Sequence, residues 1–212
     1  MQRRVMFILG VVVLMAVAFL AGVYSQGDDD ETSSTSTRRT TTSRSDAEAP
    51  EVTTTTACVL DGASTELQTG TGAGGTMLLT DVRIGTPGCL ERIVFEFRQS
   101  EGSGGVPAFG VRYENEPFHE DGSGKLVLVQ GSDFLTVRVE PASGADLSAE
   151  GNGAPTYTGS TTLTPTGLPH VRQARRIGDY EGQITWVIGL DGKRPFRAYV
   201  LASPARLVID IV

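Results

Sequence analysis

From Met77 to Val212, apolar and polar residues alternate along short runs that Gly, Pro, Asn, Asp or Ser interrupt. In LERIVFEFRQ (90–99), Ile93, Phe95 and Phe97 share one face of an extended chain, and the opposite face is largely charged. The same period of two recurs in AFGVRYE (108–114), FLTVRVE (134–140) and QITWVIGL (183–190). This period indicates strands with one buried face, because successive side chains of a strand point to opposite sides.

Two further segments add strands to this pattern. KLVLVQ (125–130) is a continuous apolar run, which predicts a strand that is covered on both faces or paired with another molecule. FRAYVLASPARLVIDIV (196–212) predicts two strands around Ser203-Pro204. No window of a dozen residues keeps the 3.6-residue apolar period of a helix. We therefore expect an all-β domain over 77–212, a small β-sandwich or open barrel of about eight to ten strands.

A different pattern occupies the N-terminus, where Val5 to Tyr24 contains no charged residue. A helix needs roughly 20 apolar residues to cross a bilayer, so residues 5–24 predict a membrane segment. Arg3 and Arg4 precede it, which predicts that residues 1–4 are cytoplasmic and that the rest of the chain lies outside. Two readings remain open: a single-pass membrane anchor, or a signal peptide cleaved before Gln26 with secretion of the rest.

Between this segment and the β-region, the composition changes twice. Residues 25–57 are rich in Ser, Thr and charged residues, and such a sequence predicts a disordered stalk. Residues 58–76 form a Gly-rich transition in which Gly70, Gly72 and Gly75 match G-x-G-x-x-G. A dinucleotide site needs this motif between a strand and a helix, whereas here a strand-like run follows it. We interpret these glycines as a flexible loop and expect no cofactor.

The charge balance narrows the choice of partners. Without Arg3 and Arg4, 16 basic residues remain against 25 acidic ones, a net charge of about −9 with His neutral. This charge repels phosphate backbones, so we expect no nucleic-acid partner.

The two cysteines, Cys58 and Cys89, lie in a compartment that the N-terminal segment predicts to be oxidising. We expect them to form one structural disulfide, and intermolecular pairing is the alternative.

Catalytic chemistry has little support in the sequence. His119 and His170 are the only histidines, and no metal-protease, nucleophile-elbow or S-x-x-K motif is present. We interpret His119 as part of a polar hairpin loop and His170 as a solvated loop residue. The sequence thus predicts a protein that is not an enzyme and holds no metal.

Two groups of side chains are candidates for ligand binding. Arg172, Arg175 and Arg176 could pair with an anionic ligand such as a wall polymer or a carboxylate, or they could neutralise neighbouring acidic residues. Tyr113 and Tyr180 could stack on sugar rings, although tyrosines are common on strands for packing reasons alone.

The segments GCLERIVFEF, VPAFGVRY, GSGKLVLVQG, FLTVRVEP and GDYEGQITWVIGLDGKRPFRAYVLASPARLVIDIV together resemble the AMIN-like domain of actinobacterial secreted and membrane-anchored proteins. The most specific parts are RIVFEF (92–97), GDYEGQITWVIGL (178–190) and PARLVIDI (204–211). The last is similar to the strand that closes true AMIN domains.

This resemblance implies a small β-sandwich that acts as a noncatalytic localisation module of the cell envelope, often by binding peptidoglycan. The chain departs from the usual pattern, because no amidase or secretin portion follows Val212. An alternative function is a scaffold or assembly protein that pairs with an envelope protein through a sheet edge.

Overall fold

The computed structural model describes residues 58–99 and 104–212, so the predicted membrane segment and stalk lie outside the described residues. Within this part of the chain, the secondary structure consists of strands, and no helix suited to crossing a membrane was found. Eight strands have six or more residues, in agreement with the prediction. Seven further strands have two or three residues, and of these Leu126–Val127 falls in the predicted strand KLVLVQ. The all-β fold class is therefore confirmed.

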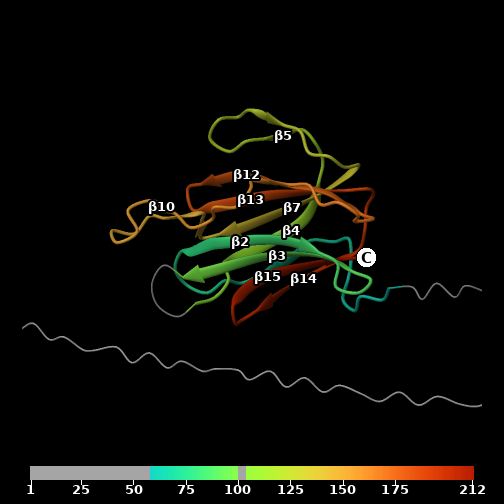
Figure 1. Cartoon of the computed structure of the whole chain (residues 1–212), viewed down its shortest axis with the longest axis horizontal. Coiled ribbons are helices and arrows are strands. Elements are labelled where there is room, and N and C mark those ends of the chain that lie inside the picture. The colour runs from blue at the N-terminus through green and yellow to red at the C-terminus, as the bar shows by residue number, and fades with distance from the viewer. Residues whose placement is uncertain (1–57, 100–103) are drawn as a thin grey trace, which may run out of the picture. The chain divides into compact units, whose positions relative to one another are not determined.

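The strands form two sheets that pack face to face (Figure 1). The order of the six-stranded sheet is β1 (Gln68–Gly70), β4 (Ala108–Glu114), β7 (Asp133–Glu140), β13 (Gln183–Leu190), β12 (Val171–Tyr180) and β11 (Thr162–Leu163). The order of the five-stranded sheet is β14 (Phe196–Leu201), β15 (Ala205–Ile211), β3 (Glu91–Gln99), β2 (Met77–Gly85) and β8 (Ala142–Ser143). All pairs are antiparallel except β2 with β8.

The main core lies between the sheets and contains the residues that the alternation assigned to it. Ile93, Phe95 and Phe97 of β3 are buried against the inward residues of β13, among which Trp186 contacts the ring of Phe95 edge-on with centroids 5.8 Å apart. Burial of apolar area at about 25 cal/mol per Å² makes this core the main source of stability. The structure is thus a β-sandwich.

A second, smaller core lies on the outer side of the six-stranded sheet. The two-stranded ribbon of β5 (Phe118–His119) and β6 (Leu126–Val127) packs there and buries Phe118, Val127, Val129, Phe134, Ile177 and Val187. Figure 1 shows the ribbon beyond β12, at the top of the view. The sheet residues that it buries lie on β7, β12 and β13, and none of them lies on β1 or β4. Another ribbon joins β9 (Ala145–Asp146) to β10 (Ala154–Pro155).

The prediction that KLVLVQ is covered on both faces is wrong, whereas the alternative, pairing with another molecule, stays a prediction. Val127 and Val129 are buried in the second core, whereas Leu126 and Leu128 are 61% and 70% exposed. Buried and exposed residues thus alternate along this segment as in a half-buried strand, and Leu126–Val127 of it forms β6.

The Gly-rich transition also differs from its prediction, because it is packed against the domain. Its β1 pairs with β4, and a Cβ on Gly70 would lie 2.2 Å from the ring of Phe109. A Cβ on Gly72 would lie 2.1 Å from the backbone nitrogen of Ala108. These two glycines permit close packing of the backbone, so the expectation of a flexible loop is wrong at both positions.

Two links fasten the start of the described chain. Cys58 and Cys89 form a disulfide, as predicted, which ties residue 58 to the turn between β2 and β3. The side chain of Gln68 in β1 bridges to the other sheet: its Nε2 donates to the carbonyl of Phe196 at 2.7 Å, and its Oε1 accepts from the amide of Ala198 at 2.6 Å. One open side of the sandwich is thereby closed by a side chain that pairs with the edge of β14.

Candidate functional site

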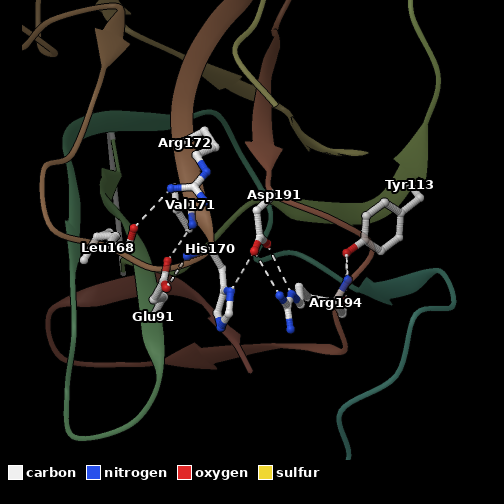
Figure 2. Close-up of polar contacts among 8 residues, drawn as sticks. All are labelled: Glu91, Tyr113, Leu168, His170, Val171, Arg172, Asp191 and Arg194. Atoms are coloured by element: carbon white, nitrogen blue, oxygen red, sulfur yellow. Dashed lines mark hydrogen bonds and ion pairs between the residues drawn. The ribbon is translucent and has the colours of Figure 1, made fainter. Parts of the chain in front are cut away.

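The three predicted arginines lie on β12 but do not form one site. The guanidinium Nη1 of Arg172 reaches only the carbonyl of Leu168, at 3.5 Å (Figure 2). Arg175 donates to the carbonyl of Leu128 at 3.2 Å. Arg176 pairs with Asp179 at 2.9 Å and lies over the ring of Tyr157.

Arg175 and Arg176 line a hollow of about 300 Å³ between β12 and the β5–β6 ribbon. Three carboxylates line the same hollow, those of Glu120, Asp121 and Asp179. Because the acids outnumber the arginines, the reading in which these arginines neutralise their neighbours fits this hollow better than an anion site does.

Tyr113 is unsuited to stacking on a sugar, because its ring and hydroxyl serve the packing of the domain. The hydroxyl donates to the carbonyl of Arg194 at 2.7 Å and accepts from the amide of the same residue at 2.8 Å (Figure 2). The ring packs edge-on against Phe196, with Lys193 over its face. Burial of the side chain raises the pKa of Tyr113 above its usual value.

His170 lies in the loop before β12, as predicted, but it is only partly solvated, because it belongs to a polar cluster at one end of the sandwich (Figure 2). Its Nδ1 lies 3.2 Å from Oδ2 of Asp191, and Arg194 pairs with the same carboxylate at 2.9 Å. The hydrogen bond from Arg194 is the largest cause that lowers the pKa of Asp191 below its usual range.

Glu91 joins this cluster from the five-stranded sheet. Glu91 is only 2% exposed. Its carboxylate accepts hydrogen bonds from the backbone amides of His170 at 2.7 Å and of Val171 at 2.6 Å. Within the described ranges, no serine, threonine or cysteine side chain hydrogen-bonds to the imidazole of His170. The cluster therefore ties the loop before β12 to both sheets and lacks the nucleophile that a histidine–aspartate pair would activate.

A more extended feature occupies the outer face of the six-stranded sheet, where three shallow hollows adjoin. The first, of about 220 Å³, is lined by Leu67, Thr69, Gly110, Arg112, Thr136 and Arg138. The second, of about 250 Å³, is lined by Ala108, Phe109, Gly110, Arg138, Glu140 and Gln183. The third, of about 400 Å³, is lined by Asp121, Gly122, Glu140, Tyr180, Glu181 and Gln183. Each shares two residues with the next, so we call the three together the polar groove.

Strand register explains why the polar groove exists. Gly110 on β4 lies between Thr69 on β1 and Arg138 on β7, and nothing lies within 4 Å of the position that its Cβ would take. A glycine at an outward position leaves a depression here, because its outward neighbours Thr69, Arg112 and Arg138 all carry side chains. At the far end, Tyr180 is 58% exposed, so of the two predicted tyrosines it is the one able to stack on a ligand.

Thr136 is the unusual residue of the groove. It faces outward beside Arg112 on the neighbouring strand, yet it is only 1% exposed, and its buried hydroxyl Oγ1 has no hydrogen-bond partner among the described residues. A buried polar group without a partner costs about 1–3 kcal/mol. A hydroxyl of this kind in the lining of a hollow marks a position where a ligand can supply the missing partner.

The sequence patterns do not single out Gly110, Thr136 or Arg138 as site residues, although a signal is present. The alternation predicts AFGVRYE and FLTVRVE as strands with one buried face, and their outward positions carry these residues. Only the pairing of β4 with β7 shows that they lie together. No group of three or more potential metal ligands occurs in the described ranges, 58–99 and 104–212.

The β-sandwich fold and the disulfide point to the class of small extracytoplasmic β-domains. A family model described as the AMIN-like domain matches residues 77–212, so the chain belongs to the AMIN-like domain family. Domains of this family are in general noncatalytic binding modules of the cell envelope. Neither a search of curated proteins nor a search of solved structures found a match.

Proposed function

We propose that this protein is a noncatalytic binding module that recognises peptidoglycan or another cell-envelope component through the polar groove. The observation that carries the proposal is the continuity of the groove, whose three hollows share lining residues across β1, β4, β7, β13 and the end of β12. A long shallow depression suits an extended polymer better than a small molecule, which binds in concave sites that bury most of its surface.

The composition of the groove supports the same proposal. Arginine, glutamate, glutamine and threonine side chains line it, and Tyr180 provides an aromatic face at one end. Hydroxyl- and amide-rich polymers are recognised by such mixtures of hydrogen-bonding groups with an aromatic ring for stacking. Membership of the AMIN-like family favours peptidoglycan as the polymer to test first.

The test is cosedimentation of the full-length protein, in detergent, with purified peptidoglycan. Gly110→Phe places a ring in the groove without backbone strain, because the residue has an ordinary φ and free space above it. Gly85→Phe is the matched control, since Gly85 ends β2 on the other sheet and also has nothing within 4 Å of its Cβ position. We expect wild type and Gly85→Phe to cosediment and Gly110→Phe to bind at least tenfold more weakly.

Either of two results would contradict the proposal. The first is a wild type that sediments no better than an unrelated acidic β-domain, and the second is Gly110→Phe binding as well as Gly85→Phe. The second result would exclude the groove as the binding site even if the protein bound peptidoglycan.

A scaffold function is favoured by one specific observation, the exposed leucines of the β5–β6 ribbon. Among the described strands, β6 pairs only with β5, and Leu128 beside it is 70% exposed. An envelope protein could add a strand here and cover the leucines. A photo-crosslinking residue at Leu128 should then capture a partner in cells, and the same residue at Leu147, which is 75% exposed, is the control. Recovery of monomer alone from Leu128 would exclude this function.

A further inference from the structure

From the first hollow of the groove, we infer a carboxylate-binding subsite formed by Thr136, Arg112 and Arg138. The inference rests on the proposed function, because it names the chemical group of the envelope ligand that this end of the groove holds. The three residues come from adjacent strands, with Arg112 directly opposite Thr136 and Arg138 two residues further along β7.

The hydroxyl of Thr136 supplies the first part of the argument. Its Oγ1 is buried and has no partner, although a hydroxyl can donate one hydrogen bond and accept others. A neutral ligand group could satisfy it, but a carboxylate oxygen is the acceptor that forms the stronger, charge-assisted bond. The hollow that Thr136 lines has a volume of about 220 Å³, enough for a carboxylate with a short aliphatic group.

The guanidinium groups supply the second part. The Nε of Arg112 donates to Oε1 of Glu114 at 2.6 Å, and Nη2 of Arg138 lies 3.4 Å from the same oxygen. One glutamate thus serves two arginines, and the three side chains carry a net charge of +1. Each arginine keeps N–H groups that no described acceptor uses, and their planar arrangement matches the two oxygens of a carboxylate.

The charge also decides between anions. A net charge of +1 is complementary to a monoanion such as a carboxylate, whereas a phosphate monoester carries nearly two negative charges at neutral pH. Leu67, which is 56% exposed, lines the same hollow and can contact the aliphatic group next to the carboxylate. The C-terminus of a short peptide and the acid group of a sugar acid share this chemistry.

The test is a ligand-observed NMR titration of the full-length protein in detergent. The probes are acetyl-alanyl-alanine with a free carboxylate, its C-terminal amide, glucuronate and inorganic phosphate. We expect the free acid to bind at least tenfold more tightly than the amide and more tightly than phosphate. Comparison of the free acid with glucuronate identifies the source of the carboxylate as peptide or sugar acid, and the subsite is supported in both cases.

Variants separate a binding role from a structural one. Thr136→Val keeps the shape of the side chain and removes the unpaired hydroxyl, so it should weaken the free acid at least fivefold without lowering Tm. Arg138→Gln should weaken it at least fivefold as well. Arg83→Gln on the other sheet is the control, because Arg83 is similarly exposed and also paired with acids, and it should leave binding unchanged.

Four results would overturn the subsite: equal binding of the peptide acid and its amide, no binding of either the peptide acid or glucuronate, phosphate binding as tightly as the tighter of these two acids, or an unchanged affinity in Thr136→Val. Its failure is distinguishable from failure of the proposed function. Peptidoglycan cosedimentation that depends on Gly110 while the acid probe does not bind refutes only the subsite. If the acid probe binds but the protein does not cosediment with peptidoglycan, only the proposal that peptidoglycan is the ligand is refuted.

Discussion

Glu91→Ala should be the most destabilising single change at the polar end of the sandwich. The carboxylate of Glu91 starts on β3 of one sheet and accepts the amide protons of His170 and Val171, which lead into β12 of the other sheet. Truncation leaves both amides without this partner in a site where Glu91 is 2% exposed and Val171 is 1% exposed. At about 1–3 kcal/mol for each unsatisfied buried group, the loss is about 3 kcal/mol in total.

A loss of this size corresponds to a fall in Tm of roughly 6–12 °C for a domain of this length. The assay is urea and thermal unfolding followed by the fluorescence of Trp186, the single tryptophan, which is buried in the main core. Glu96→Ala is the matched control on the same strand. Glu96 pairs with the exposed Arg83, so its removal should cost less than about 1 kcal/mol.

Equal effects of the two substitutions would refute the reasoning, because the argument depends on burial and not on charge. A change in Glu91→Ala of less than about 0.5 kcal/mol would also refute it, since surface substitutions commonly fall within that range.

Three further predictions use the same unfolding assay. Replacing Cys58 and Cys89 by serine should cost about 3–4 kcal/mol, because the disulfide closes a loop with a sequence separation of 31. Gln68→Leu should cost about 1–2 kcal/mol, because the amide of Ala198 loses its partner and the carbonyl of Phe196 keeps only the amide of Ser64. Asp191→Asn should flatten the loss of Tm below about pH 4, because the folded state lowers the pKa of Asp191 and the unfolded state therefore binds its proton first.

Each of these predictions has a contradicting result. Equal stability of the oxidised wild type and the double serine variant would contradict a stabilising role of the disulfide. An unchanged free energy of unfolding in Gln68→Leu would mean that solvent replaces the hydrogen bonds that Gln68 makes to the backbone of β14. The contribution of Asp191 is present at neutral pH and lost on acidification, so an acid limb that is identical in wild type and Asp191→Asn would contradict the assigned shift.

The main core could be predicted from the sequence because alternation is a local property. Ile93, Phe95 and Phe97 were assigned to the core from a ten-residue window, and all three are buried there. The same rule left KLVLVQ ambiguous, since a run without alternation does not say which of its faces is covered. Only the position of the β5–β6 ribbon on Phe134 and Val187 resolves it.

The candidate site was harder to predict because it depends on contacts between distant strands. The arginines of β12 are dense in sequence, yet two of the three acids that accompany them, Glu120 and Asp121, come from the β5–β6 ribbon and only Asp179 lies on β12. The polar groove instead combines single residues from several strands, such as Gly110 and Thr136, neither of which forms a motif. The lack of a partner for the Thr136 hydroxyl is a property of packing and leaves no trace in the sequence.

The disulfide between Cys58 and Cys89 has a mechanical consequence. Force applied through the residues that precede Cys58 passes by way of the sulfur atoms to the turn between β2 and β3, two strands inside the five-stranded sheet. The three-residue strand β1 follows Cys58 in the chain and would be the first element to unzip if that bond were absent. With the bond in place, tension bypasses β1 and reaches two nine-residue strands together, so the wall of the polar groove that β1 forms keeps its shape under load.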